Sequence, residues 1–274
     1  MLYHEKKIKS GKMLEIDFYP VHKNGNKYND GRSKAQKKAQ DDYNHKKSER
    51  ELIRRVNCNF DNGDLFVHLT YAQKYAPESY EEAKRDINNY LRRINNWRRN
   101  NGFDKARYII IIEEQTYKTG ERAGKSNFHF HIFLSKMPRD IAEQIWNKGR
   151  CNADRYQPDT FGQTAAAQYC AKDPRGKKRF ICSRNCVKPK ESEPKQRKFS
   201  QRKIRNMCEV YAHDSEYWQR KYPGYAFCES FPVMNPYNGK WYLRVEMRKI
   251  STGMQNAKCK MQNYGGSSPK GRRF

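Results

Sequence analysis

Long apolar runs are missing from this sequence. No stretch approaches the roughly 20 apolar residues that a membrane-spanning helix needs, and the N-terminal residues MLYHEKKIKSGK lack the apolar core of a signal peptide. Apolar residues make up 36% of the chain, less than the roughly 45–50% of an average globular protein. We therefore expect a soluble, cytoplasmic protein with no membrane partner.

Cysteine pairs are scarce as well. The eight cysteines are scattered, and only Cys182 and Cys186 lie close together, in a C-x-x-x-C spacing without a second such pair. Zinc ribbons and zinc fingers need two tighter pairs of ligands. The pattern argues against structural zinc and favours reduced thiols.

A phosphate-binding loop is imitated but absent. Residues 120–126, GERAGKS, have three residues between the glycines, whereas a P-loop has four and is followed at once by a helix. Here the residues that follow predict a strand. We interpret the segment as a hairpin loop, and ATP is not implied.

Positive charge is what the sequence has in excess. The 274 residues include 57 Lys and Arg against 30 Asp and Glu, a net charge of +27, and 13% of the chain is aromatic. This combination suits a polyanion whose bases stack on aromatic rings. Residues 175–274 alone hold 24 basic and 7 acidic side chains, whereas residues 62–174 are nearly balanced and contain the clearest periodic patterns.

These patterns divide the chain into four predicted segments. We expect a charged N-terminal extension over 1–61, a folded catalytic core over 62–182, a basic and aromatic C-terminal module over 183–264 and a disordered tail over 265–274. Within the basic stretch 175–205 a surface that follows phosphates is favoured over a merely solvated face. The candidate DNA contacts in that stretch are Arg175, Lys177, Lys178, Arg179, Arg184 and Lys188.

Periodicity in the core predicts an α+β fold. Residues 65–71 and 108–113 have the composition of strands, and residues 79–99 have the apolar spacing of an amphipathic helix. Further helices are expected near 139–148 and 163–172. The order of elements favours an antiparallel sheet with helices on one side.

The segment 126–135, SNFHFHIFLS, carries two histidines inside a run of large apolar side chains. Side chains of a strand alternate between its faces, so His129 and His131 share one face while the apolar residues share the other. Two imidazoles one strand repeat apart can bind one divalent metal ion. Ordinary core or surface histidines are the alternative.

Two carboxylates end the preceding apolar strand. A hairpin would place either Glu113 or Glu114 beside the histidines, but adjacent strand residues face opposite ways, so only one can join them. Glu113 is in phase with Ile109 and Ile111. Two histidines and one carboxylate leave open positions on an ion such as Mg²⁺ or Mn²⁺, although the pair could instead mark the emergence of the strand into solvent.

The alanine-rich segment 164–172, TAAAQYCAK, predicts a helix with Tyr169 and Lys172 on one face. A tyrosine hydroxyl with a pKa near 10 is a poor nucleophile unless a nearby cation favours its phenolate. Each residue alone is explained by ordinary packing or solvation. Together with the histidines, they are candidate catalytic residues.

Three patterns now stand in order along the chain: Leu69-Thr70-Tyr71, His129-Phe130-His131 and Tyr169-Cys-Ala-Lys172. In this order they resemble the motifs of the HUH endonuclease superfamily, in particular those of the rolling-circle replication initiators (Rep proteins) of small plasmids and phages. The resemblance covers roughly residues 62–182.

The resemblance implies a five-stranded antiparallel sheet with flanking helices and a divalent metal, Mg²⁺ or Mn²⁺. The metal would be bound by His129, His131 and Glu113, with Glu114 as the alternative ligand. It implies strand-specific nicking and rejoining of single-stranded DNA at a replication origin. Tyr169 would form a covalent bond to the 5′ phosphate.

The family also suggests a branch and partners. Ala165 and Asp173 stand where two-tyrosine initiators have their second tyrosine, so a one-tyrosine enzyme is expected, with Lys172 assisting Tyr169. Host helicase and polymerase would be partners, in a bacterium that carries a plasmid or phage. Two alternatives stay open, a non-enzymatic nucleic-acid-binding protein and an HUH-type transposase.

Overall fold

The computed structural model describes residues 2–21, 34–119, 123–157, 167, 170, 180–236 and 238–250, with the backbone alone for 34–39 and 195–198. The chain divides into two compact units. Unit 1 consists of residues 1–8, 13–21 and 192–274, and unit 2 consists of residues 9–12 and 22–191. The expected tail at 265–274 lies outside the described residues.

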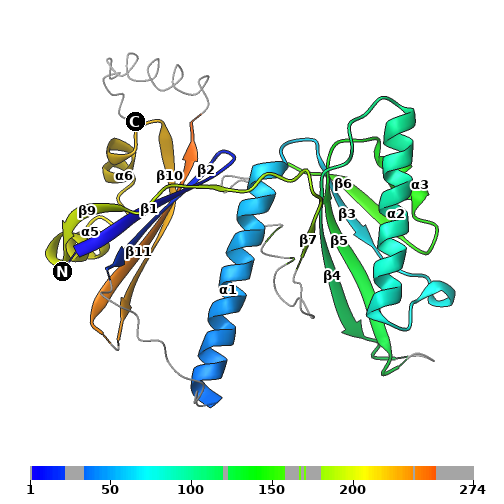
Figure 1. The fold of residues 1–274 in the computed structure, drawn as a ribbon, viewed down its shortest axis with the longest axis horizontal. Helices are drawn as coiled ribbons and strands as arrows, with labels where there is room; N and C mark the ends of the chain where they lie inside the picture. Colours follow the sequence, from blue (N-terminus) through cyan, green and yellow to red (C-terminus); the bar gives the residue numbers. More distant parts are fainter. Residues whose placement is uncertain are drawn as a thin grey trace, which may run out of the picture. The chain divides into compact units, whose positions relative to one another are not determined.

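Unit 2 contains a five-stranded antiparallel sheet in the order β6-β3-β5-β4-β7 (Figure 1). Its strands are β3 (Leu65–Leu69), β4 (Tyr108–Thr116), β5 (Ser126–Leu134), β6 (Cys151–Arg155) and β7 (Ile181–Cys182). Its helices are α1 (Lys34–Asn59), the short 3₁₀ helix η1 (Gln73–Tyr75), α2 (Tyr80–Asn100) and α3 (Arg139–Ile145). The predicted α+β class with a five-stranded antiparallel sheet is confirmed.

One face of this sheet packs against α2. The even-numbered residues of β5, from Phe128 to Leu134, are almost fully buried there together with Ile87 and Leu91 of the helix. The helix presents these residues because its apolar side chains recur every three to four positions. It begins at a capping Ser79, whose hydroxyl accepts a hydrogen bond from the backbone N–H three residues later.

The opposite face packs against α1. Leu52 and Val56 of this helix are buried in a cluster with Ile109 and Ile111 of β4. The expectation of helices on one side of the sheet was therefore wrong. Apolar residues four positions apart form a short stripe on α1, and the many charged residues of the helix conceal that stripe in the sequence.

Unit 1 is built on a second sheet, in the order β10-β11-β2-β1-β8, with β9 also paired to β1. The strands are β1 (Leu2–Ser10), β2 (Met13–Pro20), β8 (Lys190–Glu191), β9 (Lys195–Ser200), β10 (Tyr225–Asn235) and β11 (Lys240–Lys249). The helices α5 (Gln201–Glu209) and α6 (Ser215–Lys221) contribute Ile204 and Trp218 to its core.

The first twenty residues are therefore not a separate charged extension. Leu14, Ile16 and Phe18 of β2 are buried in the core of unit 1, and β2 pairs with β11 from the other end of the chain. The alternation of these residues with Glu15 and Asp17 was a legible strand signal. Their partner strand, more than 200 residues away, was not.

Aromatic side chains of the C-terminal region build this core. Trp218 and Tyr222 are buried, and Tyr225, Phe227 and Trp241 pack against the same cluster. Packing therefore accounts for these rings, and base stacking is not needed to explain them.

Two absences hold within the described part of the chain. None of its helices is long and apolar enough to cross a membrane. Its seven cysteines are all free thiols.

Candidate functional site

Three neighbouring strands bring three histidines and one glutamate to the same side of the unit 2 sheet. His129 and His131 belong to β5, Glu113 to β4 and His68 to β3. In the antiparallel pairings Glu113 lies opposite His129, and His68 lies opposite His131. We call the side of the sheet that carries these four residues the histidine face; their apolar strand neighbours pack on the other side, against α2.

Glu113 and His131 are in direct contact. The Nε2 atom of His131 lies 3.1 Å from Oε2 of Glu113, and the amide of Gln115 donates a hydrogen bond to Oε1 at 3.0 Å. The His131 side chain is only 4% exposed, whereas that of Glu113 is 26% exposed. The carboxylate is thus held in place by two neighbours while it stays accessible from solvent.

Glu114 belongs to the other side of the sheet. It lies opposite Phe128 in the pairing of β4 with β5, and its Oε1 accepts a hydrogen bond from the Ser126 hydroxyl at 2.5 Å. Of the two carboxylates, Glu113 is therefore the one that shares a face with the histidines. Its role as a metal ligand stays a prediction.

His68 was not identified from the sequence. Its ring stacks on that of His131, with centroids 4.5 Å apart and an angle of 16° between the planes, and its centroid lies 6.2 Å from that of His129. The signal for its orientation was present, because Leu65, Val67 and Leu69 alternate with Phe66 and His68. Its proximity to the other histidines depends on the register between β3 and β5.

The environment favours neutral imidazoles and an ionised carboxylate. Burial lowers the pKa of His129, and burial followed by the charges of His131 and His129 lowers the pKa of His68. For Glu113, burial acts to raise the pKa, but hydrogen bonds with Gln115 and His131 outweigh it and the pKa falls below its usual value. These are the protonation states in which imidazole and carboxylate bind cations.

The donor set fits a divalent cation, although the side chains are not yet arranged around one. Within the described ranges, no three His, Cys, Asp or Glu side chains already converge on a point that an ion could occupy. The fit rests on two imidazoles and a carboxylate on one face, and on the Nε2 atom of His68. That atom is buried and has no hydrogen-bond partner among the residues that the structure describes. An ion would require the side chains to reorient.

The predicted nucleophile Tyr169 and its partner Lys172 lie outside the described residues. Two neighbours are described, however: Ala167 and Cys170 are helical and buried, in the cluster that contains Ile109 and Ile111 on the histidine face. Burial, and secondly the nearby carboxylate of Glu113, raise the pKa of Cys170 to about 12. The residue that follows Tyr169 therefore senses the charge of Glu113.

The first sequence pattern, Leu69-Thr70-Tyr71, has a structural role. Leu69 is fully buried, and the carbonyl of Thr70 accepts a hydrogen bond from the indole N–H of Trp146 at 2.9 Å. The hydroxyl of Tyr71 donates to Asp86 at 3.2 Å, and burial together with this carboxylate raises its pKa far above the usual value. Tyr71 is thus held protonated, which makes it a poor competitor for the role of nucleophile.

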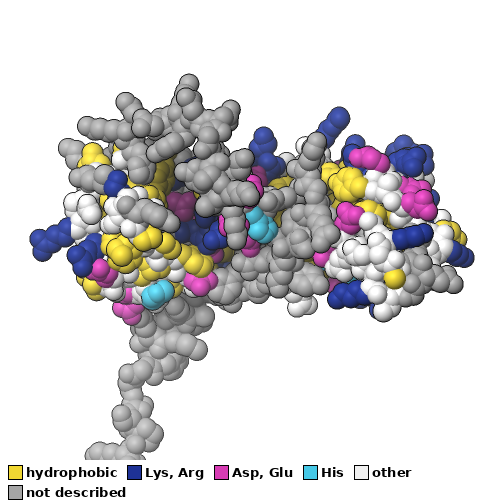
Figure 2. All heavy atoms as spheres, turned by 90° about the horizontal axis from the view of Figure 1, so that it is seen from below, with side chains coloured by type: hydrophobic (Ala, Val, Ile, Leu, Met, Phe, Trp, Pro, Cys, Tyr) yellow, Lys and Arg dark blue, Asp and Glu magenta, His cyan; other side chains and the backbone are white. Residues whose placement is uncertain are grey.

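Of the candidate DNA contacts, only Arg184 and Lys188 are described, and both are exposed. The loop that carries them is anchored, since the Asn185 amide donates to the carbonyl of Lys105 at 3.0 Å and the N–H of Val187 donates to the Asn59 side chain at 2.7 Å. Arg175, Lys177, Lys178 and Arg179 lie outside the described residues. On the face drawn in Figure 2, the Lys and Arg side chains of unit 2 are interspersed with Asp and Glu.

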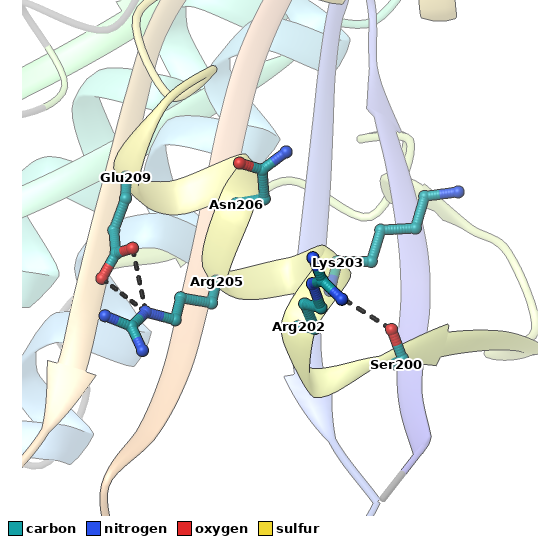
Figure 3. A pocket seen from close by; sticks show the side chains of 6 residues that line it. All are labelled: Ser200, Arg202, Lys203, Arg205, Asn206 and Glu209. Atoms are coloured by element: carbon teal, nitrogen blue, oxygen red, sulfur yellow. Dashed lines mark hydrogen bonds and ion pairs between the residues drawn. The ribbon is translucent and has the colours of Figure 1, made fainter.

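The end of the basic stretch forms a pocket of about 520 Å³ in unit 1 (Figure 3). It is lined by Ser200, Arg202, Lys203, Arg205, Asn206 and Glu209. The Arg205 guanidinium lies 2.9 Å from both carboxylate oxygens of Glu209, so much of its charge is already balanced. Ser200 caps α5. The pocket is basic, but its residues are largely engaged with one another.

One comparison with known proteins gives a match. Residues 64–174 match the model of a family described as replication-associated protein ORF2. No curated protein and no solved structure matches the chain. The matched segment contains all three sequence patterns and the histidine face, and the family suggested by the sequence is confirmed.

Proposed function

We propose that this chain, whose residues 64–174 belong to that family of replication-associated proteins, nicks and rejoins one strand of single-stranded DNA at a replication origin. The observation that carries the proposal is the composition of the histidine face. Glu113, His129 and His131 share that face with Ala167 and Cys170, which flank the predicted nucleophile. The nick would start rolling-circle replication.

Tyr169 would be the nucleophile. Its hydroxyl oxygen attacks the phosphorus of a phosphodiester, a tyrosine–phosphate bond forms at the 5′ side of the nick, and the bond to the 3′ oxygen breaks. The 3′ oxygen leaves as a hydroxyl after it takes up a proton. One phosphoester bond is made for each one broken, so the reverse attack by a 3′ hydroxyl rejoins the strand without ATP.

A divalent ion, Mg²⁺ or Mn²⁺, bound by His129, His131 and Glu113 would supply the Lewis acid that polarises the phosphoryl oxygen. The protein contributes position. The ring of His131 lies between Phe66, 6.0 Å away by centroids, and His68, and Glu113 is held by Gln115. A group fixed by its neighbours loses little entropy when the substrate arrives.

The remaining charges would act on the DNA. Lys172, one turn after Tyr169, would offset negative charge that develops on the phosphate. Arg184, Lys188 and the other basic residues of 175–205 would bind phosphates at any sequence. Unwinding and synthesis would fall to a host helicase and polymerase, in the cytoplasm of a bacterial host.

The test is the mapping of a covalent adduct. Labelled single-stranded oligonucleotides are incubated with Mn²⁺ and the protein, and the modified peptide is sequenced by mass spectrometry. The wild-type protein should carry the nucleotide on Tyr169. Tyr169→Phe should form neither nick nor adduct but bind DNA as before, because only the hydroxyl is removed.

Tyr75→Phe is the matched control, since Tyr75 is an exposed tyrosine, 43% accessible, on η1. It should behave like the wild type. An adduct on any other residue would overturn the assignment of Tyr169. Binding without an adduct on any substrate would indicate a non-enzymatic DNA-binding protein.

A further inference from the structure

The position of His68 is the least expected feature of the histidine face. The residue lies in β3, directly opposite His131 in the pairing with β5. Its two strand neighbours, Val67 and Leu69, are fully buried on the α2 side. His68 must therefore project onto the histidine face, where packing alone would be served by an apolar residue such as Phe66, two positions earlier.

The nitrogen atoms of His68 pose a problem that packing does not solve. Its Nε2 is buried and has no hydrogen-bond partner in the part of the chain that the structure describes. A buried polar atom without a partner costs on the order of 1–3 kcal/mol, and native proteins keep few of them without a reason such as an ion. The ring stands 4.5 Å from His131 and 6.2 Å from His129 by centroids.

We propose that His68 is a further ligand of the cation, so that three imidazoles and the Glu113 carboxylate hold it. The inference rests on the function proposed above, because it concerns the same site. It names a ligand that neither the sequence patterns nor the family match supplies. It also changes which ions the site should prefer.

A third imidazole shifts the preference away from Mg²⁺. Magnesium binds oxygen ligands and gives up its water reluctantly, whereas imidazole suits transition metals such as Co²⁺, Ni²⁺ and Zn²⁺. His68 should therefore contribute strongly to the binding of Co²⁺ and weakly to the binding of Mg²⁺. Mn²⁺, at the weak end of the transition-metal series, should lie between them.

The experiment separates ligation from stacking. The metal-free full-length protein is titrated with Co²⁺, followed by its visible absorption, and Mg²⁺ is measured by competition, with no DNA present. His68→Phe keeps an aromatic ring to stack on His131 but has no nitrogen, and His68→Ala removes both. His213→Ala, an exposed histidine of unit 1, is the matched control.

Both His68 variants should lose about tenfold or more in Co²⁺ affinity, at least the loss known for residues that merely support a ligand. The Co²⁺ spectrum should change, and Mg²⁺ affinity should stay nearly the same. The His213→Ala protein should match the wild type. Circular dichroism identifies a variant that fails to fold, and the other variant then decides.

A His68→Phe protein with wild-type Co²⁺ affinity and spectrum would overturn the inference and leave His68 as a stacking partner. If His129→Ala abolishes Co²⁺ binding while His68→Phe does not, the metal site stands and only the ligand assignment to His68 fails. If His68→Phe loses Co²⁺ affinity but no substrate yields an adduct, the inference about His68 is supported and the proposed nicking function fails.

Discussion

The two faces of the unit 2 sheet are made by alternate residues of the same strands, yet they differ in kind. On one face Val67, Phe130 and Ile132 are fully buried beneath α2. On the other, His68 and His129 occupy the positions between them and are only half-buried. A period of two thus lets one strand serve a core and a site at once.

The histidine face is itself divided. Part of it is apolar, where Ile111 and Phe133 pack beneath α1 together with Ala167 and Cys170. The polar part begins at Glu113, where β4 continues towards its exposed end. The difference teaches that stability should come mostly from the α2 face and chemistry from the polar part of the histidine face, and each prediction below tests that separation.

The largest effect is expected from removal of the histidines. In His129→Ala combined with His131→Ala, or after treatment with a chelator, cleavage of single-stranded DNA should fall below detection, because the metal that polarises the phosphate is lost. Salt-sensitive DNA binding should remain, because it depends on Lys and Arg. Gel assays of nicking and fluorescence anisotropy of binding measure the two. Cleavage that persists in chelator would contradict the metal site.

The converse change strikes the α2 face. Phe130→Ala should lower the free energy of unfolding by about 3–5 kcal/mol, because it leaves a cavity in a fully buried core. His129→Ala, the adjacent half-buried residue, should cost no more than about 1 kcal/mol. Urea unfolding followed by the fluorescence of Trp146, which packs in the same cluster, compares them. Equal losses would show that the two faces share the stability.

Neighbouring carboxylates of β4 give a finer test. Glu113→Gln should reduce the affinity for Mn²⁺ by about tenfold or more, since it removes a charged donor from the histidine face. Glu114→Gln should have little effect, because Glu114 lies on the other side and pairs with Ser126. Isothermal titration with Mn²⁺ measures both. A larger loss for Glu114→Gln would reverse the ligand assignment.

The smallest effect is expected away from both faces. Arg184→Ala with Lys188→Ala should weaken DNA binding several-fold at every sequence and lower the salt slope by about 1.4, or about 0.7 for each phosphate contact to a single strand. The cleavage position should not move. Arg92→Ala with Arg99→Ala, two exposed residues of α2, is the matched control. Equal losses in both double variants would indicate a general charge effect.

The sequence was sufficient where the signal is local. Alternation along 126–134 determined that His129 and His131 share a face, and phase with Ile109 and Ile111 determined which of two glutamates lies with them. The period of α2 identified its buried side. These properties depend on residues a few positions apart, whose relative directions follow from backbone geometry alone.

Only the tertiary structure decided which distant segments meet. His68 joins the histidines because β3 pairs with β5 in one register, and a slip by one residue would have turned it away. Residues 13–18 became part of a sheet because β11 offered a partner. Leu52 and Val56 became part of the core because the sheet offered an apolar surface. Such pairings depend on burial shared between remote residues, so no local pattern specifies them.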